Sequence, residues 1–284
     1  MTFSIVARSD DGRCWGVAVA TKFLAAGAAV PALEAGSGAL ATQAWANLAY
    51  RPQGLALLRT GLAAQQVVDA LTATDDVRAQ RQLGVVDGAG ESATYTGADC
   101  LEWAGGRAGP GYAIQGNILF GPQVVEDMER AWLSFEDPGG SATLQLARRL
   151  YAVLRAGDAA GGDRRGRQSA ALAVVGLDGG IGPVTARGQG ADVVVDLRVD
   201  DHDDPVRELG RLLGLADLYF GEPDPASLLP LTGELAEEVD RRVRALGHRD
   251  LQTWAGVENY EGRLVEGSID PVVLAKLREA TPGP

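Results

Sequence analysis

Two apolar runs separated by an Asp-Gly pair open the chain, and they constrain its fold more than any other feature. The runs cover residues 2–8 and 14–22, and Asp11-Gly12 lies between them. An Asp-Gly pair between strand-like runs is the strongest short-range signal for a β-hairpin, because both residues accept the positive φ angles of a tight turn. Both faces of this hairpin are largely apolar. We therefore expect it to be buried on both sides, with Asp11-Gly12 as a two-residue loop.

The register of this hairpin places the beginning of the chain, with the Thr2 hydroxyl, beside Lys22. Thr2 falls opposite Thr21, and Met1 falls opposite Lys22. If Met1 is removed, Thr2 carries a hydroxyl and a free α-amine, whose ordinary pKa of about 7.7–8.0 lets it take the hydroxyl proton. A neighbouring ammonium lowers the pKa of that amine, which suits a base. The pattern predicts Thr2 as a nucleophile beside Lys22. The alternative is an ordinary Met-Thr start and a solvated lysine at a strand end.

Composition narrows the classes of partner. The chain has 284 residues, enough for one large domain and a small appendage. Its formal charge is −12, which disfavours nucleic acid as a partner. Two cysteines and two histidines disfavour a disulfide framework and a zinc site, so we expect no metal and no cofactor. We find neither a signal peptide nor a membrane-spanning run, and we expect a cytoplasmic protein without a membrane partner.

Hydrophobic periodicity predicts an α+β domain followed by a small helical domain. The predicted strands cover 38–43, 81–87, 92–96, 169–176 and 191–199, and the predicted helices cover 53–60, 64–73, 122–135, 143–156 and 205–215. Prolines and a glycine at 220–225 predict a linker, so the main domain is 1–221 and the second is 222–284. Helices over 232–246, 251–260 and 271–278 are expected in the second domain.

Two polar segments of the main domain allow more than one interpretation. The loop Gly161–Ser169 is rich in arginine and could clamp a substrate carboxylate, or it could be an exposed basic loop with nothing bound. The acidic string Asp196–Asp204 could bind a hard cation, with Asp196, Asp200 and His202 as ligands of a metal-dependent hydrolase. A simpler interpretation is that Asp203 or Asp204 caps a helix that begins at Pro205.

Two side-chain amides are candidates for holding a reacting group. Asn117 follows Gln115-Gly116, where an amide beside a flexible glycine can point at a developing oxyanion. It could equally be a plain turn residue. Gln43 stands at a predicted strand end with the same ambiguity.

Several of these strings together resemble a known family. They are residues 1–8, 41–44, 115–117, 161–170 and 196–202. Over residues 1–221 the chain resembles a prokaryotic family catalogued as domain of unknown function 1028, which is grouped with the N-terminal-nucleophile hydrolases. The resemblance implies a four-layer αββα sandwich and amide hydrolysis. Thr2 would match the nucleophile, and Lys22 resembles the lysine that proteasome-type members keep nearby. The tail, with residues 254–261 and 269–271, is similar to a peptidoglycan-binding module.

The leading hypothesis is a bacterial amidohydrolase that cleaves a peptide-like or cell-wall-derived amide with Thr2, Lys22 and Asn117. Candidate substrate contacts are Gln43, Asp163, Arg164, Arg165, Gln168, Asp196, Arg198, Asp200 and His202. The rival is a non-catalytic protein that keeps the sandwich as a scaffold and binds peptidoglycan fragments or a protein partner. A homodimer is the expected assembly. The catalytic hypothesis requires removal of Met1, because the α-amine of Thr2 is otherwise blocked.

Overall fold

The structure is a computed structural model that describes residues 2–180 and 192–281. The chain divides into two compact units. The larger runs to Asp137 and includes Leu146–Gly180 and the stretch that ends at Leu213, and the smaller contains Pro138–Gln145 and the chain from Gly214 onward. None of the helices in the described ranges is both long and apolar enough to cross a membrane.

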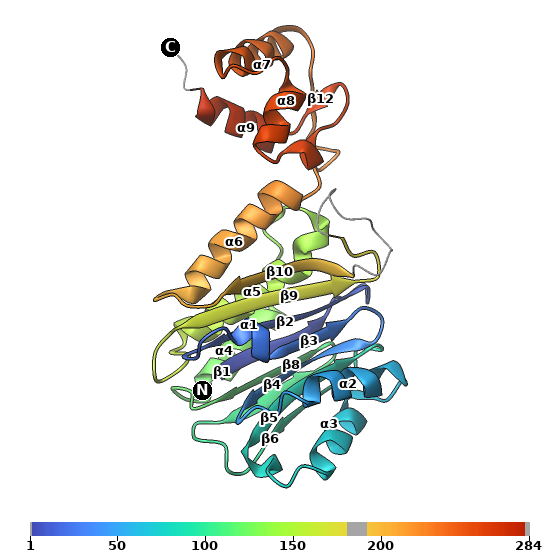
Figure 1. Cartoon of the computed structure of the whole chain (residues 1–284), viewed down its shortest axis with the longest axis vertical. Coiled ribbons are helices and arrows are strands. Elements are labelled where there is room, and N and C mark those ends of the chain that lie inside the picture. The colour runs from blue at the N-terminus through green and yellow to red at the C-terminus, as the bar shows by residue number, and fades with distance from the viewer. Residues whose placement is uncertain (1, 181–191, 282–284) are drawn as a thin grey trace. The chain divides into compact units, whose positions relative to one another are not determined.

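A six-stranded antiparallel sheet forms the centre of the larger unit (Figure 1), in the order β10-β9-β2-β1-β8-β7. Its strands are β1 (Thr2–Arg8), β2 (Cys14–Thr21), β7 (Gly105–Gly109), β8 (Tyr112–Asn117), β9 (Ser169–Gly176) and β10 (Val193–Val199). Residue 191, where we expected β10 to begin, lies outside the described residues. The strands β7 and β8 were not predicted, because glycines and polar residues interrupt their apolar pattern.

The predicted hairpin is confirmed as β1 and β2. Phe3 pairs with Ala20 and Arg8 with Trp15, the register that brings Thr2 to Thr21. The predicted loop length was wrong. The Ser9 N–H donates to the Cys14 carbonyl, so the loop covers residues 10–13. Side-chain oxygens of Ser9 and Asp11 accept the Arg13 N–H, which stabilises the longer turn without changing the register.

A second antiparallel sheet has the order β3-β4-β5-β6. Its strands are β3 (Pro31–Glu34), β4 (Gly38–Ala44), β5 (Arg81–Asp87) and β6 (Ser92–Thr96), and the predicted β5–β6 hairpin is confirmed. Helices α2 (Tyr50–Arg59) and α3 (Ala64–Ala73) cover one face of this sheet (Figure 1). Leu40 and Leu83 of the sheet pack there against Leu58 and Val67 of the helices.

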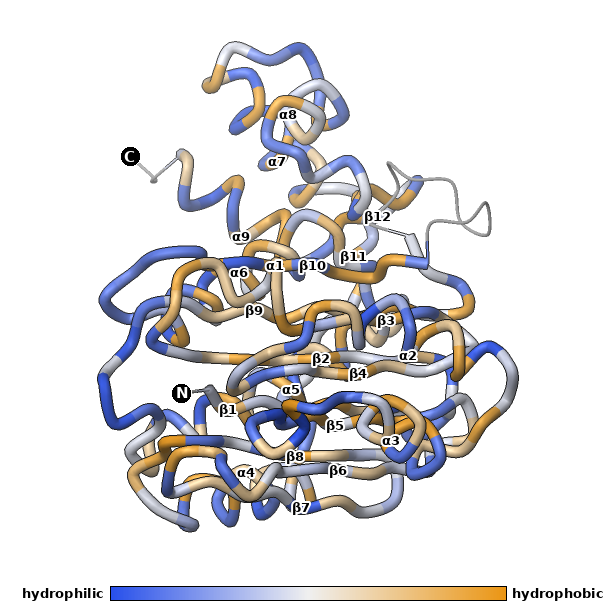
Figure 2. Tube along the Cα trace, turned by 60° about the horizontal axis from the view of Figure 1, so that its bottom comes forward, coloured by the Kyte–Doolittle hydropathy of each residue, from blue (hydrophilic) through white to orange (hydrophobic). Residues whose placement is uncertain are grey.

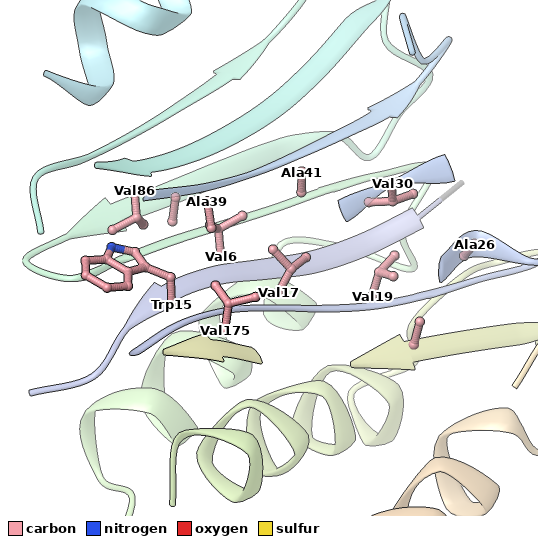
Figure 3. Close-up of a cluster of buried hydrophobic side chains, with 12 residues drawn as sticks. Val6, Trp15, Val17, Val19, Ala26, Val30, Ala39, Ala41, Val86 and Val175 are labelled. Atoms are coloured by element: carbon pink, nitrogen blue, oxygen red, sulfur yellow. The ribbon is translucent and has the colours of Figure 1, made fainter. Parts of the chain in front are cut away.

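The two sheets face each other across a buried layer (Figure 3). Val6, Trp15 and Val17 of the six-stranded sheet meet Ala39 and Val86 of the four-stranded sheet. Side chains alternate along a strand, so Phe3 and Ile5 point to the opposite face. That face carries helices, since a Cβ added at Gly157 would meet Phe3 and Met128. The hairpin is therefore buried on both sides, as predicted.

The remaining elements of the larger unit are helical. They are α1 (Ala26–Ala29), η1 (Arg78–Gln80), α4 (Gln123–Leu133), α5 (Gln145–Ala159) and α6 (Pro205–Phe220), which belongs to the smaller unit from Gly214 onward. We predicted that α6 would end at residue 215. It continues because Leu218 and Tyr219 pack against the core of the smaller unit.

The smaller unit consists mainly of helices. Its elements are η2 (Ala142–Leu144), β11 (Leu229–Pro230), α7 (Gly233–Ala245), α8 (Leu251–Val257), η4 (Glu261–Arg263), β12 (Ser268–Ile269) and α9 (Pro271–Ala280). Hydrophobic and hydrophilic stretches alternate along it (Figure 2), and the apolar ones bury Trp254, Val243 and Leu277. The Arg263 guanidinium and the Asp270 carboxylate form a buried ion pair at 2.7 Å in this core.

Candidate functional site

Thr2 lies in a row of four polar residues that crosses the six-stranded sheet. Asn117 ends β8 and pairs with Thr2, and Thr21 ends β2 and pairs with Ser169 at the start of β9. The Thr2 hydroxyl donates to the Thr21 hydroxyl at 3.1 Å, which joins the two pairs into one row. All four residues are buried, and Thr2 is 7% exposed. We call this end of the two sheets the Thr2 edge.

A chain of buried side-chain hydrogen bonds lies between the sheets beside this row. Gln115 Nε2 donates to Ser4 Oγ at 2.6 Å, and Ser4 Oγ donates to Gln43 Oε1 at 2.6 Å. Gln43 Nε2 and Asn117 Nδ2 both donate to Gln82 Oε1, at 2.8 and 2.9 Å. None of these five side chains is more than 1% exposed. We call them the amide network.

Backbone carbonyls fix the orientation of the amides. Gln82 Nε2 donates to the carbonyls of Gly116 and Gly105, at 2.7 and 3.3 Å. A carbonyl only accepts, so Oε1 of Gln82 must face Gln43 and Asn117. Asn117 therefore turns its nitrogen inward. A primary amide has two N–H groups, and Gln82 is the one side-chain or backbone acceptor that Asn117 Nδ2 has in the described part of the chain, so one N–H remains.

Unusual backbone conformations mark the same edge. Ala44 ends β4 with φ 65°, Ile118 follows β8 with φ 51°, and Ala25 lies in the loop after β2 with φ 53°. Residues with a Cβ are strained in this left-handed region, most of all a β-branched one such as Ile118. Such strain persists where the surrounding structure holds it, often at functional sites. Its concentration beside Thr2 supports this edge as the candidate site.

The carboxylate of Asp163 joins two segments at the edge. It accepts the backbone N–H of Lys22 at 2.7 Å and that of Arg165 at 2.8 Å, and it is 8% exposed. The side chain of Lys22 is exposed, and its Nζ donates to the Arg167 carbonyl at 3.2 Å. Met1, which the sequence places opposite Lys22, lies outside the described residues. A catalytic role for Lys22 stays a prediction.

The residues of the acidic string make several separate contacts. Asp196 and Arg198 form an ion pair with each other at 2.7 Å on β10. The backbone of Asp200 accepts the Ala25 N–H at 3.0 Å, and the His202 N–H donates to the Gln168 carbonyl at 2.8 Å. Across the described ranges, no group of three or more His, Cys, Asp or Glu side chains is placed to hold a metal ion.

The predicted helix cap is confirmed at Asp204. Its carboxylate accepts the Arg207 N–H at 3.4 Å in the first turn of α6. The Asp204 N–H in turn donates to His202 Nδ1 at 2.9 Å. These bonds give the end of the acidic string a structural role.

The ion pair between Arg81 and Asp75 holds the loop that follows β4. The Asp75 carboxylate accepts Arg81 Nε at 2.8 Å and the Tyr50 hydroxyl at 2.8 Å, and Asn47 Nδ2 lies 3.2 Å away. These bonds, that from Arg81 above all, hold the pKa of Asp75 well below its usual range. Burial, and then the bond to Asp75, raises the pKa of Tyr50. Arg81 also donates to the Trp45 carbonyl, so the pair fixes the loop at the Thr2 edge.

Sequence reasoning missed three members of the amide network: Ser4, Gln82 and Gln115. Gln82 and Gln115 look like ordinary polar residues on a solvated face. The spacing Thr2-Ser4-Val6 carried a signal, because all three share the face that we expected to be buried. Buried polar side chains on that face require partners on another strand.

Comparison with known proteins identifies the family of this chain. A family model described as "Family of unknown function (DUF1028)" matches residues 2–209. The chain belongs to this family. The crystal structure of a family protein from Silicibacter pomeroyi is similar, with 28% sequence identity and a TM-score of 0.64. The match covers 84% of this chain and 92% of that one. Among curated proteins no match was found.

The C-terminal part matches a separate family model, described as "Putative peptidoglycan binding domain", over residues 219–277. The match lies within the smaller unit and includes α7, α8 and α9 as far as Leu277. Both resemblances inferred from the sequence are thus confirmed at the level of the family.

Proposed function

We propose that this family member is an N-terminal-nucleophile amidohydrolase that uses Thr2 after removal of Met1. The observation that carries the proposal is the place of Thr2. It begins a central strand, it is buried, and its hydroxyl is held by Thr21 beside the amide of Asn117. The two facing sheets, with helices on their outer faces, agree with the αββα sandwich of such hydrolases. A cell-wall-derived amide is the proposed substrate because the chain also matches a peptidoglycan-binding domain.

The chemistry requires few groups. Thr2 Oγ1 attacks the amide carbonyl carbon while its proton passes to the α-amine of the same residue. The second N–H of Asn117, with backbone amides, holds the negative oxygen of the tetrahedral intermediate. The α-ammonium then protonates the departing amine as the C–N bond breaks, which leaves an ester on Thr2. A water molecule then attacks the ester while it gives a proton to the α-amine. The α-ammonium passes a proton to Thr2 Oγ1 as the ester C–O bond breaks, which releases the acid and restores the Thr2 hydroxyl.

The amide network supports this chemistry by positioning. Gln43 Nε2 lies 3.4 Å from the Thr2 carbonyl, and Gln82 orients Asn117. A donor fixed before the reaction stabilises the intermediate without a cost for reorientation. The buried amides thus give a reason for Thr2 and Asn117 to keep one geometry.

Two measurements test the proposal. Intact-mass analysis of protein from its native host should find a species that lacks Met1. Trimmed protein should hydrolyse a peptide or muropeptide amide, and Thr2→Ala should lower kcat roughly a thousandfold or more. Thr2→Ser, which keeps the hydroxyl, should retain part of the rate. Thr60→Ala, at an exposed helix end, is the control. Complete retention of Met1, or activity that survives Thr2→Ala, would remove the proposal.

A binding protein without catalysis is the second candidate, favoured by the peptidoglycan-binding match of the C-terminal part. It predicts that Met1 is retained and that muropeptides bind without turnover. Titration of the full chain with a muropeptide, followed by mass analysis of the ligand, separates the two: an unchanged ligand supports binding alone.

A further inference from the structure

The segment after β8 presents two exposed side chains on one outer face. Leu119 and Asp163 form an antiparallel bridge, in which the Phe120 N–H donates to the Gly162 carbonyl and the Arg164 N–H to the Ile118 carbonyl. Leu119 and Asp163 are buried, whereas the residue that follows each of them, Phe120 and Arg164, is exposed. Phe120 is 67% exposed, and Arg164 is exposed too. The two are diagonal neighbours across the bridge, a spacing of about 7–8 Å that long side chains span.

The arginines of the loop 161–169 favour binding of an anion beside Phe120. Two of the arginines in the loop 161–169 have acidic partners: Arg165 pairs with Asp163 and Arg167 with Asp158. Within the part of the chain that the structure describes, Arg164 has no carboxylate within ion-pair distance. It thus leaves a guanidinium available for a bidentate bond to a carboxylate, although the protein as a whole carries a charge of −12.

Apolar side chains gather around the same edge. The loops that follow β2, β4 and β8, and the segment bonded to Ile118, carry large hydrophobic residues that are 53–69% exposed. They are Phe23, Leu24, Trp45, Leu48, Leu101 and Phe120. Exposed apolar residues grouped around polar ones often mark a ligand site. We call them the apolar rim.

We propose that Phe120 and Arg164 form a subsite for a peptide-like amide that carries a free carboxylate next to a large apolar side chain. The carboxylate binds Arg164, and the apolar side chain lies on Phe120 and the adjoining rim. This inference rests on the proposed function, because Asn117, two residues before the bridged Leu119, would set where the scissile carbonyl lies. A substrate is favoured as occupant over a second copy of the chain, since a copy seated on the rim would cover Thr2.

Binding of a small substrate analogue to a variant that lacks the nucleophile tests the subsite without any turnover. The full chain with Thr2→Ala is titrated with N-acetyl-L-phenylalanine, with its uncharged amide and with N-acetylglycine, and heat or NMR shifts are measured. We expect the acid to bind at least about tenfold more tightly than the amide, because the amide lacks the ionic bond to Arg164. N-acetylglycine, which lacks the ring, should bind more weakly than N-acetyl-L-phenylalanine.

Variants assign the effect to the two side chains. Arg164→Gln should weaken binding of the acid about tenfold and leave the amide unchanged. Phe120→Ala should weaken both roughly threefold. Arg130→Gln removes another exposed guanidinium, on α4, and is the matched control. Thermal unfolding checks that each variant remains folded.

Three outcomes would overturn the subsite: equal affinity for acid and amide, no saturable binding of the acid, or an Arg164→Gln variant that binds as tightly as its parent. Failure of the hydrolase proposal looks different. It would appear as intact binding of N-acetyl-L-phenylalanine by a protein that hydrolyses none of the amides tested.

Discussion

The layer between the two sheets has two halves that are equally buried and chemically opposite. At the Thr2 edge lie the five side chains of the amide network, and further along the two sheets lie Val6, Trp15, Val17 and Val86. Ser4 and Val6 are neighbours on one face of β1, and both are 0% exposed. The two halves therefore differ in side-chain chemistry and not in burial.

This difference shows where the structure buries polar groups that would be destabilising without hydrogen bonds. A buried polar group that lacks a hydrogen bond costs about 1–3 kcal/mol, and an apolar side chain avoids that cost. The amide network is tolerated because its bonds are satisfied across both sheets. It lies beside Thr2 and the strained backbone residues, while the other half is apolar. The simplest physical explanation is that the polar half holds a site in one geometry.

The largest expected effect comes from the centre of the amide network. Gln82→Leu leaves Gln43, Asn117 and two backbone carbonyls without their common partner. We expect the free energy of unfolding to fall by about 3–5 kcal/mol, measured by urea denaturation. Gln65→Leu, at an exposed position of α3, is the control. A Gln82→Leu variant as stable as wild type would mean that the two halves are energetically equivalent.

A matched pair of smaller changes tests the two halves on one strand. Ser4→Ala removes the partner of Gln43 and Gln115, and Val6→Thr places a hydroxyl in the apolar half. Each should cost about 1–3 kcal/mol of unfolding free energy. Ser4→Ala should also lower kcat, whereas Val6→Thr should not. If both variants lower kcat equally, the network has no special link to the site.

The next effect, a loss of stability that involves Asp75, is expected only at acidic pH. The pKa of Asp75 is lower in the folded protein than in the unfolded chain, so its contribution to stability is complete above the unfolded pKa. That contribution is lost as the pH falls below about 4 toward the folded pKa. The difference in unfolding free energy between wild type and Asp75→Asn should shrink over this window. A constant difference would contradict the depressed pKa.

The smallest effect is expected at the apolar rim. The Trp45 side chain is 69% exposed, so Trp45→Ser should change the free energy of unfolding by less than about 0.5 kcal/mol. Denaturation at several protein concentrations also tests the expected dimer. A larger loss that depends on concentration would show that a second copy covers the rim, which contradicts the proposed substrate subsite.

Much of the fold could be predicted because its signals are local. The register of β1 and β2 follows from turn chemistry and period-two burial, and α3, β5, β6 and β9 follow from periodicity within each segment. The strands β7 and β8 could not be recognised in this way. Glycines lower strand propensity, and Gln115 and Asn117 look solvent-exposed until the opposite sheet is present.

Only part of the candidate site could be anticipated from the sequence, for the same reason. Thr2, Gln43 and Asn117 were each singled out from an ambiguous local pattern, and Gln82 and Ser4 were not. Asp196 and Arg198 fall on an exposed part of β10, where they pair with each other. No local pattern distinguishes an arginine that pairs with a nearby acid, such as Arg167, from one that has no such pair among the described residues, such as Arg164.

The sequence by itself determined the hairpin that sets Thr2 against Thr21, because turn chemistry and side-chain alternation act between neighbours in the chain. It also contains the motifs that show the family and the segment that matches a peptidoglycan-binding domain. Only the tertiary structure decided which polar residues are buried together. The amide network draws Gln115 and Asn117 from β8, Ser4 from β1, Gln43 from β4 and Gln82 from β5. Hydrogen bonds between side chains on separate strands depend on how two sheets face each other, and no single segment of sequence contains that information.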